Sequence, residues 1–232
     1  MAKSTKPAAA AKKAPPAPKS ELLIIDVEQG SPEWFEARLG IPTASVLATV
    51  MASGKDGGAS ITRTKLMHRL AAEIITGQPG EEGFRSIAME RGNALEDEAR
   101  QSYCRRKGVE PRRVGFVRNF SGTKLCGASP DSLLGFDGGL EIKTAKAEVL
   151  IPMLQRPAPM PPEHRAQIQG SLWICERDWW DLTIYCHRSM PALDIRVYRD
   201  EVYIRELSNE VERFNHEKGK LVEQLKRMGV AG

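Results

Sequence analysis

The 232-residue sequence predicts an α+β (mixed α/β) fold built from helices and mostly antiparallel strands. Helix start and stop signals dominate the first hundred residues, whereas alternating apolar patterns separated by turn residues follow in the middle. A helix, two strands and a long amphipathic helix complete the order. Apolar residues make up 41% and charged residues 28% of the chain, which is typical of a soluble globular protein.

The N-terminal part is predicted to contain one short strand and three helices. Ser31 is expected to cap the first helix, because proline follows it at the first helical position. Gly40 and Gly77 are the expected ends of the first and third helices. The strand is expected at residues 22–25 and the helices at residues 31–40, 43–51 and 60–76.

A fourth helix, expected at residues 87–107, carries an acid in an unusual position. Glu96 shares a stripe with Gly92, Ala99 and Tyr103, which places its carboxylate on the packed face. A carboxylate in such a place needs a cation or a hydrogen-bond partner. An ion pair with an arginine and a metal ion would each satisfy it.

The second half of the chain is predicted to hold most of the strands. A proline-rich connection is expected at residues 147–162, between the first strands and the last ones. The last helix is expected to pack its apolar face on the domain or on a neighbour, although Lys218 interrupts that face. The strands are expected at residues 114–118, 124–128, 132–135, 140–144, 180–187 and 193–198, and the helices at 163–175 and 201–228.

The segment around residues 129–143 carries the chemistry. Asp137-Gly138-Gly139 is typical of a hairpin turn, which would fold Asp131 back towards Glu141 and Lys143. Side chains alternate along a strand, so Glu141 and Lys143 share one face. Two carboxylates suit a hard cation such as Mg²⁺, and the lysine can orient a water or offset developing charge. The pattern therefore indicates a site for metal-assisted phosphodiester hydrolysis.

Acids and lysines near a hairpin are common, so this pattern alone also fits an ordinary surface hairpin. Two details favour a metal site. Leu140 and Ile142 are apolar, so Glu141 lies in a buried strand, where an unpaired carboxylate is costly. Pro130 keeps the backbone extended immediately before Asp131.

The net charge of +4 is concentrated in an Ala-, Pro- and Lys-rich tail at residues 1–20. That tail has five lysines and no acid, so the remaining 212 residues carry 29 basic and 30 acidic side chains. Such a segment buries too little apolar surface to order itself. We expect a disordered, solubilising arm, with attraction to DNA phosphates as the alternative, followed by a single domain at residues 21–232.

The four cysteines are widely spaced and include no C-x-x-C pair, so neither a zinc nor an iron–sulfur site is expected. Buried free thiols in a reducing cytoplasm are the better interpretation. No apolar run approaches the roughly 20 residues of a membrane span, and no signal peptide is evident. The sequence therefore predicts no membrane association.

Five short pieces of sequence occur one after another along the chain. They are Trp34, Arg38 and Gly40 with Thr43-Ala44-Ser45, then Arg91-Gly92 with Glu96, Ser129-Pro130-Asp131, Glu141-Ile142-Lys143, and Ala166-Gln167-Ile168-Gln169. In this order they resemble the lambda-exonuclease-like, or YqaJ-type, viral recombinase nucleases of the PD-(D/E)XK superfamily. The resemblance runs from Ser31 to about Tyr185 and implies a restriction-endonuclease-like core, with a mixed central sheet flanked by helices.

The resemblance also implies a catalytic centre. Asp131, Glu141 and the carbonyl of Ile142 would bind Mg²⁺, for which Mn²⁺ could substitute. Glu96 would complete a site for a second ion. Two ions can clamp the attacking and leaving oxygens of an in-line displacement. Lys143 and Gln167 would position the attacking water.

The same resemblance implies that Arg38 and Ser45 grip a terminal 5′-phosphate. Ser45 is expected in the first turn of a helix, where free N–H groups and the helix dipole favour an anion. A surface salt bridge is the other interpretation of Arg38. The chain departs from the family at His164, where a tyrosine is frequent, so no ring-stacking role is carried over and a solvated helix-start residue is the alternative.

The implied activity is digestion of one strand of linear duplex DNA, 5′ to 3′, leaving 3′ tails for a single-strand annealing partner. Family members form ring-shaped trimers, so a homo-oligomer is implied, within a bacterial host cell and encoded by a phage or prophage. The alternatives are a restriction-like endonuclease, a Cas4-like exonuclease, and a non-catalytic module that binds DNA ends. The widely spaced cysteines argue against the Cas4-like alternative.

Overall fold

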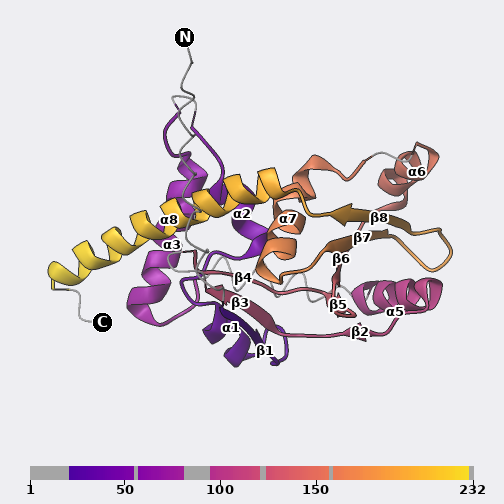
Figure 1. Cartoon of the computed structure of the whole chain (residues 1–232), viewed down its shortest axis with the longest axis horizontal. Coiled ribbons are helices and arrows are strands. Elements are labelled where there is room, and N and C mark those ends of the chain that lie inside the picture. The colour runs from indigo at the N-terminus through magenta and orange to yellow at the C-terminus, as the bar shows by residue number, and fades with distance from the viewer. Residues whose placement is uncertain (1–20, 55–56, 81–94, 121–123, 157–158, 230–232) are drawn as a thin grey trace, which may run out of the picture.

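The computed structural model describes residues 21–54, 57–80, 95–120, 124–156 and 159–229. Its elements form two sheets with helices packed around them (Figure 1). The strands are β1 (Glu21–Ile25), β2 (Pro111–Arg112), β3 (Phe116–Phe120), β4 (Cys126–Ala128), β5 (Ser132–Leu134), β6 (Gly138–Thr144), β7 (Trp179–Tyr185) and β8 (Leu193–Tyr198). The α-helices are α1 (Pro32–Arg38), α2 (Leu47–Val50), α3 (Ile61–Thr76), α5 (Leu95–Lys107), α6 (Ala147–Gln155), α7 (Arg165–Ile174) and α8 (Glu201–Arg227). Two 3₁₀ turns, η1 (Ala44–Val46) and η2 (Pro162–His164), precede α2 and α7.

The larger sheet has the order β2-β5-β6-β7-β8 and is mixed, because β6 and β7 are parallel whereas the other neighbours are antiparallel. The smaller sheet, β1-β3-β4, is antiparallel. Helix α5 covers one face of the larger sheet, while α7 packs on the other face and against the smaller sheet (Figure 1). This arrangement confirms the predicted α+β class with a mixed central sheet.

One apolar core joins both sheets to helices from both ends of the chain. Val117 of β3, Leu182 of β7 and Ile168 of α7 are buried in it. Helix α8 contributes Leu207 and Phe214, so the expected packing of the last helix on the domain is confirmed. Among the helices that the structure describes, none has a stretch long and apolar enough to cross a bilayer.

The predicted cap of the first helix and the predicted end of the third are present, and the third helix also has a serine cap that was not predicted. Ser31 accepts a hydrogen bond from the backbone N–H of Trp34, and Ser60 does the same for Arg63 at the start of α3. Gly77 ends α3 in the left-handed conformation, with φ of 65°. The predicted start of the fourth helix and the Arg91-Gly92 piece lie outside the described residues.

The predicted helix at residues 43–51 is wrong in one respect that bears on function. Ser45 lies in the 3₁₀ turn η1, and the α-helix α2 that follows has only four residues. No α-helical first turn therefore presents its N–H groups at Ser45. The argument from a helix dipole does not apply there.

The proline-rich segment at residues 147–162 also differs from expectation, since α6 occupies its first part. Pro152 lies inside this helix, where a proline removes one backbone hydrogen bond. Leu150 is fully buried and anchors the helix against the fold. Burial of that side chain offsets the cost of the proline.

The hairpin turn lies two residues earlier than predicted. Residues 135–137 make the turn, with Gly135 at φ of 55°, and Gly138 and Gly139 begin β6. A Cβ on Gly138 would lie 2.1 Å from the ring of Trp179, and one on Gly139 would lie 2.3 Å from that of Trp180. The two glycines are therefore needed for close packing against tryptophan rings in β7 rather than for the turn.

Lys218 points into the protein, although the sequence placed it as an interruption of the apolar face of the last helix. Its side chain is buried, and its ammonium donates to the carbonyl of Gly40 at 2.5 Å and to Oδ1 of Asn215 at 3.0 Å. Burial lowers the pKa of Lys218 to about 8, although the nearby carboxylate of Glu73 partly opposes this.

This lowered pKa predicts a pH-dependent stability. Between pH 8 and 10.5 the unfolded chain binds a proton at Lys218 that the folded chain has released, so the free energy of unfolding should rise with pH there. The gain is about 3 kcal/mol at most. Burial raises the pKa of Cys175 to about 12, which acts in the opposite direction above pH 9. The contribution of Lys218 is therefore best measured as a difference between variants.

Urea unfolding of the wild type and of Lys218→Met from pH 7 to 10 isolates that contribution. The stability of the wild type relative to the variant should increase as the pH rises from 8. Lys220→Met is the matched control, because Lys220 is exposed on the same helix. A stability difference that stays constant with pH would contradict the lowered pKa.

Candidate active site

The register of the β5–β6 hairpin brings the two predicted metal-binding acids together. Ser132 pairs with Leu140, and one step further along the same register Asp131 lies opposite Glu141. Oδ2 of Asp131 accepts a hydrogen bond from the backbone N–H of Ile142 at 2.5 Å. The carboxylate of Asp131 is thus fixed immediately before the start of β5, beside the Glu141-Ile142 peptide.

Glu141 lies on the face of β6 that points towards α7. Its side chain is buried, and its Oε1 lies 2.8 Å from the ammonium of Lys143. The same oxygen accepts a hydrogen bond from Nε2 of Gln167, in α7, at 2.5 Å. Ile142 packs on the opposite face with Tyr103 of α5. The predicted alternation along this strand is confirmed, and Asp131, Glu141, Lys143 and Gln167 come together in one site.

The site contains more negative than positive charge. Burial raises the pKa of Asp131 well above its usual range, and the carboxylates of Glu141 and Glu96 raise it further. The backbone N–H of Ile142 and the ammonium of Lys143 oppose this rise without cancelling it. A cation would relieve the repulsion among these acids, and oxygen donors are the ligands that Mg²⁺ prefers. The residues present therefore fit a hard divalent cation.

These acids do not form a ready-made cage. Within the described part of the chain, no group of three His, Cys, Asp or Glu side chains is arranged to hold a metal ion. The predicted ligand set, Asp131 and Glu141 with the carbonyl of Ile142, has two such side chains.

Glu96 is not packed in the interior as predicted, because 38% of its side chain is exposed. Its Oε1 lies 2.5 Å from the guanidinium of Arg100, one turn later in α5. Arg100 also donates to the backbone carbonyl of Asp131 at 3.3 Å. The arginine partner that the sequence left open is thus present, and it connects Glu96 to the strand that carries Asp131. The sequence analysis did not single out Arg100, although it follows Glu96 by four residues, which is the spacing of a helical ion pair.

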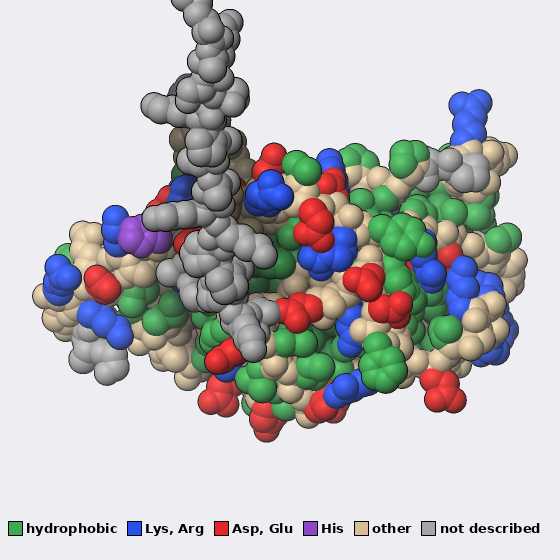
Figure 2. All heavy atoms as spheres, in the orientation of Figure 1, with side chains coloured by type: hydrophobic (Ala, Val, Ile, Leu, Met, Phe, Trp, Pro, Cys, Tyr) green, Lys and Arg blue, Asp and Glu red, His purple; other side chains and the backbone are tan. Residues whose placement is uncertain are grey.

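A cleft of about 700 Å³ opens beside Asp131 and Glu96. Three arginines line it, namely Arg100, Arg112 and Arg113, together with acids that include Asp26 and Asp97. On the face seen in Figure 2, acidic and basic side chains are intermixed over most of the surface, as expected for a folded body without excess charge. Basic side chains gather near the C-terminal turn of α5.

Arg38 lies where α1 ends and is held by aromatic and hydroxyl groups. Its guanidinium stacks on the ring of Trp34, 3.9 Å from the ring centroid, and donates to Oγ of Ser129 at 2.9 Å. The indole N–H of Trp34 donates to the same Oγ at 3.0 Å. Ser129 precedes Pro130-Asp131, so this hydroxyl links Arg38 to the segment that carries Asp131. The sequence marked Ser129 as part of a motif but not as a site residue.

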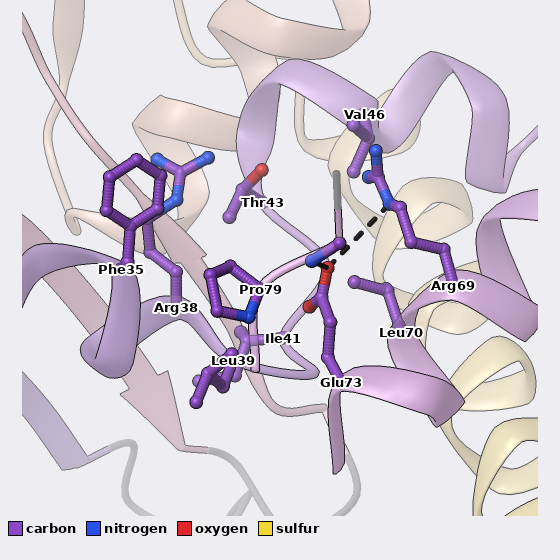
Figure 3. A pocket seen from close by; sticks show the side chains of 11 residues that line it. Phe35, Arg38, Leu39, Ile41, Thr43, Val46, Arg69, Leu70, Glu73 and Pro79 are labelled. Atoms are coloured by element: carbon purple, nitrogen blue, oxygen red, sulfur yellow. Dashed lines mark hydrogen bonds and ion pairs between the residues drawn. The ribbon is translucent and has the colours of Figure 1, made fainter. Parts of the chain in front are cut away.

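Arg38 also lines a small cavity of about 50 Å³ between α1 and α3 (Figure 3). Thr43, Arg69 and Glu73 contribute polar side chains to its wall. Ser45 does not line this cavity: it is exposed, and its Oγ lies 3.2 Å from Oγ1 of Thr43. The structure therefore places Arg38 in the cavity wall and Ser45 next to Thr43, which lines the same cavity.

His164 ends the η2 turn and lies three residues before Gln167. Burial, and then the positive charge of Lys143, lower the pKa of His164, while Glu163 and Glu141 raise it. The imidazole is therefore half-buried and close enough to the active site to sense its charges. It is not the fully solvated helix-start residue that the sequence allowed.

Comparisons with known proteins agree with this geometry. The model of the YqaJ-like viral recombinase domain matches residues 33–178. An alkaline exonuclease from Laribacter hongkongensis is 32% identical, with a TM-score of 0.72 over 86% of this chain and 98% of its own. Its complex with dAMP gives 31% identity and a TM-score of 0.70, with the same coverage of both chains.

A phage-related exonuclease from Haemophilus somnus shares the fold at 13% identity, with a TM-score of 0.58 over 80% of this chain and 96% of its own. No curated protein sequence matched the chain. The architecture is of the PD-(D/E)XK type, as the resemblance implied, and the family model covers well over half of the sequence. The chain therefore belongs to the YqaJ-like viral recombinase family.

Proposed function

We propose that this protein is a divalent-metal-dependent exodeoxyribonuclease that digests one strand of linear duplex DNA, 5′ to 3′. The observation that carries the proposal is the meeting of Asp131 with Glu141, whose Oε1 lies 2.8 Å from Lys143 and 2.5 Å from Gln167. Similarity to an alkaline exonuclease along 98% of that chain supports this activity. The complex of the same relative with dAMP supports a deoxynucleotide as the product.

In this proposal Asp131, Glu141 and the carbonyl of Ile142 hold Mg²⁺ or Mn²⁺, and Glu96 contributes to a second ion. Bound divalent ions would supply Lewis-acid stabilisation of the charge that develops on the phosphate oxygens. The carboxylates provide the hard oxygen ligands and the negative charge that such ions need. Asp131 is presented in a fixed orientation by its hydrogen bond from Ile142.

Lys143 and Gln167 orient the attacking water. Both side chains donate to one oxygen of Glu141, which fixes their positions. A water beside that carboxylate would therefore contact the ammonium of Lys143, the amide of Gln167 and a carboxylate oxygen that can accept its proton. The ammonium of Lys143 also offsets negative charge on the phosphate as the transition state forms. Fixed groups of this kind need no reorganisation during the reaction.

Other nuclease classes and a non-catalytic DNA-end module fit less well. In a Cas4-like protein four cysteines hold an iron–sulfur cluster. Here Cys104, on α5, packs among apolar residues between α5 and the larger sheet, whereas Cys126 and Cys175 are buried in the main core. A non-catalytic module would not need Lys143 and Gln167 held on a buried Glu141. Similarity to an alkaline exonuclease favours that class over a restriction-like endonuclease.

The remaining parts of the proposal concern organisation and partners. Residues 21–232 form a single nuclease domain, which is supported by the shared core of α7 and α8. The protein acts as a homo-oligomer, a trimer by family resemblance, and passes 3′ tails to a single-strand annealing protein in the bacterial host of a phage or prophage. The basic segment at residues 1–20 lies outside the described residues.

Preference for 5′-phosphorylated ends tests the direction of digestion. If the region around Arg38 receives a 5′-phosphate, digestion should start about tenfold to a hundredfold faster at phosphorylated than at hydroxyl 5′ ends, since a charge-assisted contact contributes about 1.5–3 kcal/mol. Arg38→Ala should remove most of this preference, and Ser45→Ala should reduce it. Initial rates on 5′-phosphorylated and 5′-hydroxyl duplexes measure both effects.

Arg227→Ala serves as the control, because Arg227 lies at the far end of α8 and is 82% exposed. It should keep the preference of the wild type. Equal rates on both kinds of end, unchanged by Arg38→Ala, would remove the phosphate pocket from the proposal while leaving the nuclease activity.

A further inference from the structure

Gly40 lies in the tight turn that follows Arg38. The backbone N–H of Ile41 donates to the carbonyl of Arg38 at 3.0 Å, which closes this turn around Gly40. Gly40 has φ of +67°, and a Cβ there would lie 2.3 Å from Cγ1 of Ile74 in α3. The backbone at Gly40 is therefore pressed against α3 in a conformation that favours glycine. A shift of Gly40 would move the end of α1, which carries Arg38.

Two buried charged side chains from different helices hold the polar groups of Gly40. Its N–H donates to Oε2 of Glu73, in α3, at 3.0 Å. Its carbonyl accepts from the ammonium of Lys218, in α8, at 2.5 Å. Glu73 is 8% exposed and Lys218 is 5% exposed. The backbone of a single glycine is thus fixed from two sides by opposite charges.

Burial of these charges is costly, as the lowered pKa of Lys218 shows. A well-packed apolar pair would hold α3 and α8 together at least as well, because desolvation of two charged side chains offsets most of the attraction between them. Helix packing therefore does not account for the charges at Glu73 and Lys218. Their hydrogen bonds to Gly40 give directional control of the backbone, which apolar contacts cannot supply.

Glu73 connects this arrangement to the cavity beside Arg38 (Figure 3). While its Oε2 holds Gly40, its Oε1 accepts from the backbone N–H of Gly80 at 3.3 Å and lies 3.9 Å from Nε of Arg69. Gly80 and Arg69 line the same cavity as Arg38. One carboxylate therefore fixes the turn after Arg38 and a second segment of the cavity wall.

We infer that Glu73 and Lys218 are positioning residues for end recognition: they fix Gly40 and, through it, the place of Arg38 in the proposed 5′-phosphate pocket. The inference rests on the proposed function of Arg38 and adds the elements that set its geometry. Neither side chain needs to touch DNA. Small misplacements of a binding group lower affinity, so loss of either hydrogen bond to Gly40 should weaken the preference for phosphorylated ends.

Lys218→Met tests the inference, with Glu217→Gln as a matched control. Glu217 is the neighbour of Lys218 in α8 and pairs with Arg63 of α3 at 2.5 Å, so it joins the same two helices without contacting Gly40. Initial rates over a range of duplex concentrations give KM and kcat for 5′-phosphorylated and 5′-hydroxyl ends. Circular dichroism at the assay temperature identifies the folded variants.

Lys218→Met should lower the preference for phosphorylated ends about tenfold by raising KM for those ends, with kcat close to that of the wild type. Glu217→Gln should keep the preference even where it lowers the melting temperature. A folded Lys218→Met that retains the preference of the wild type would overturn the inference, and so would equal losses in both variants.

If Lys218→Met does not fold, two substitutions at Glu73 test the inference instead. Glu73→Ala removes the acceptor for Gly40 and should lose the preference, whereas Glu73→Gln keeps an amide oxygen for that N–H and should retain it. Retention in both variants would overturn the inference. A wild type without any preference for phosphorylated ends would instead remove the proposed pocket, and this inference with it.

Discussion

Asp131→Asn should reduce DNA hydrolysis by about 10³-fold, which corresponds to about 4 kcal/mol of transition-state stabilisation. Asparagine keeps an oxygen that can accept from the N–H of Ile142, so the hairpin should stay intact. The loss of activity would come from the missing carboxylate charge, because a divalent ion binds a neutral amide oxygen more weakly than a carboxylate oxygen. Glu141→Gln should lower activity to a similar extent, because it removes the other carboxylate charge. Its amide oxygen can still accept from Gln167, so the local structure should be retained. Release of acid-soluble nucleotides in the presence of Mg²⁺ measures both.

Although it lowers activity, Asp131→Asn should increase the stability of the protein when divalent ions are chelated. Asp131 is held near Glu141 and Glu96, and removal of its charge relieves their repulsion. The melting temperature of Asp131→Asn in EDTA should therefore exceed that of the wild type. Mg²⁺ should raise the melting temperature of the wild type and leave that of the variant nearly unchanged.

Asp137→Asn is the matched control, because Asp137 is an exposed acid in the turn of the same hairpin. It should retain full activity and the Mg²⁺-dependent stabilisation. If Asp131→Asn digests DNA at a rate close to that of the control, Asp131 is not a ligand of the catalytic ion.

Lys143→Ala is expected to lower kcat by about 10²–10³-fold with a much smaller change in KM. The ammonium lies 2.8 Å from Oε1 of Glu141, which places it beside a proposed metal ligand rather than at a remote DNA-binding surface. An interaction that strengthens only as charge develops acts on kcat. Lys143→Arg should not restore activity, since the planar guanidinium is larger than the compact ammonium and donates in a different geometry.

Lys146→Ala provides the comparison, because Lys146 is exposed three residues later at the start of α6. Its loss should leave kcat unchanged and affect only salt-dependent DNA binding. A Lys143→Ala variant whose defect is confined to KM would mark Lys143 as a DNA-binding residue with no part in the chemical step.

Much of the site could be predicted because its key residues are local in sequence. One hairpin carries Asp131, Glu141 and Lys143, and alternation along a strand is enough to place the last two on one face. The register could not be predicted, since the glycines that signalled the turn serve instead to accommodate the rings of Trp179 and Trp180. Those contacts depend on the parallel pairing of β6 with β7, which no local pattern reveals.

The residues that sequence analysis missed have partners far away in the chain. Arg100 contacts Asp131, and Ser129 contacts Trp34 and Arg38, through pairings that only the folded sheets create. Lys218 was interpreted as an interruption of an apolar face because its acceptor, the carbonyl of Gly40, is 178 residues earlier. A buried lysine in an otherwise apolar helix face is the one signal that could have prompted a search for such an acceptor.

Digestion of end-labelled DNA tests the proposed exonuclease activity most directly. A linear duplex labelled on the 5′ end of one strand and the 3′ end of the other, a covalently closed circle of the same sequence and the wild-type protein with Mg²⁺ are sufficient. We expect early release of the 5′ label as a mononucleotide, retention of the 3′ label on long single strands, and no change in the circle, which offers no end. Efficient cutting of the closed circle, or early release of the 3′ label, would contradict a 5′-to-3′ exonuclease.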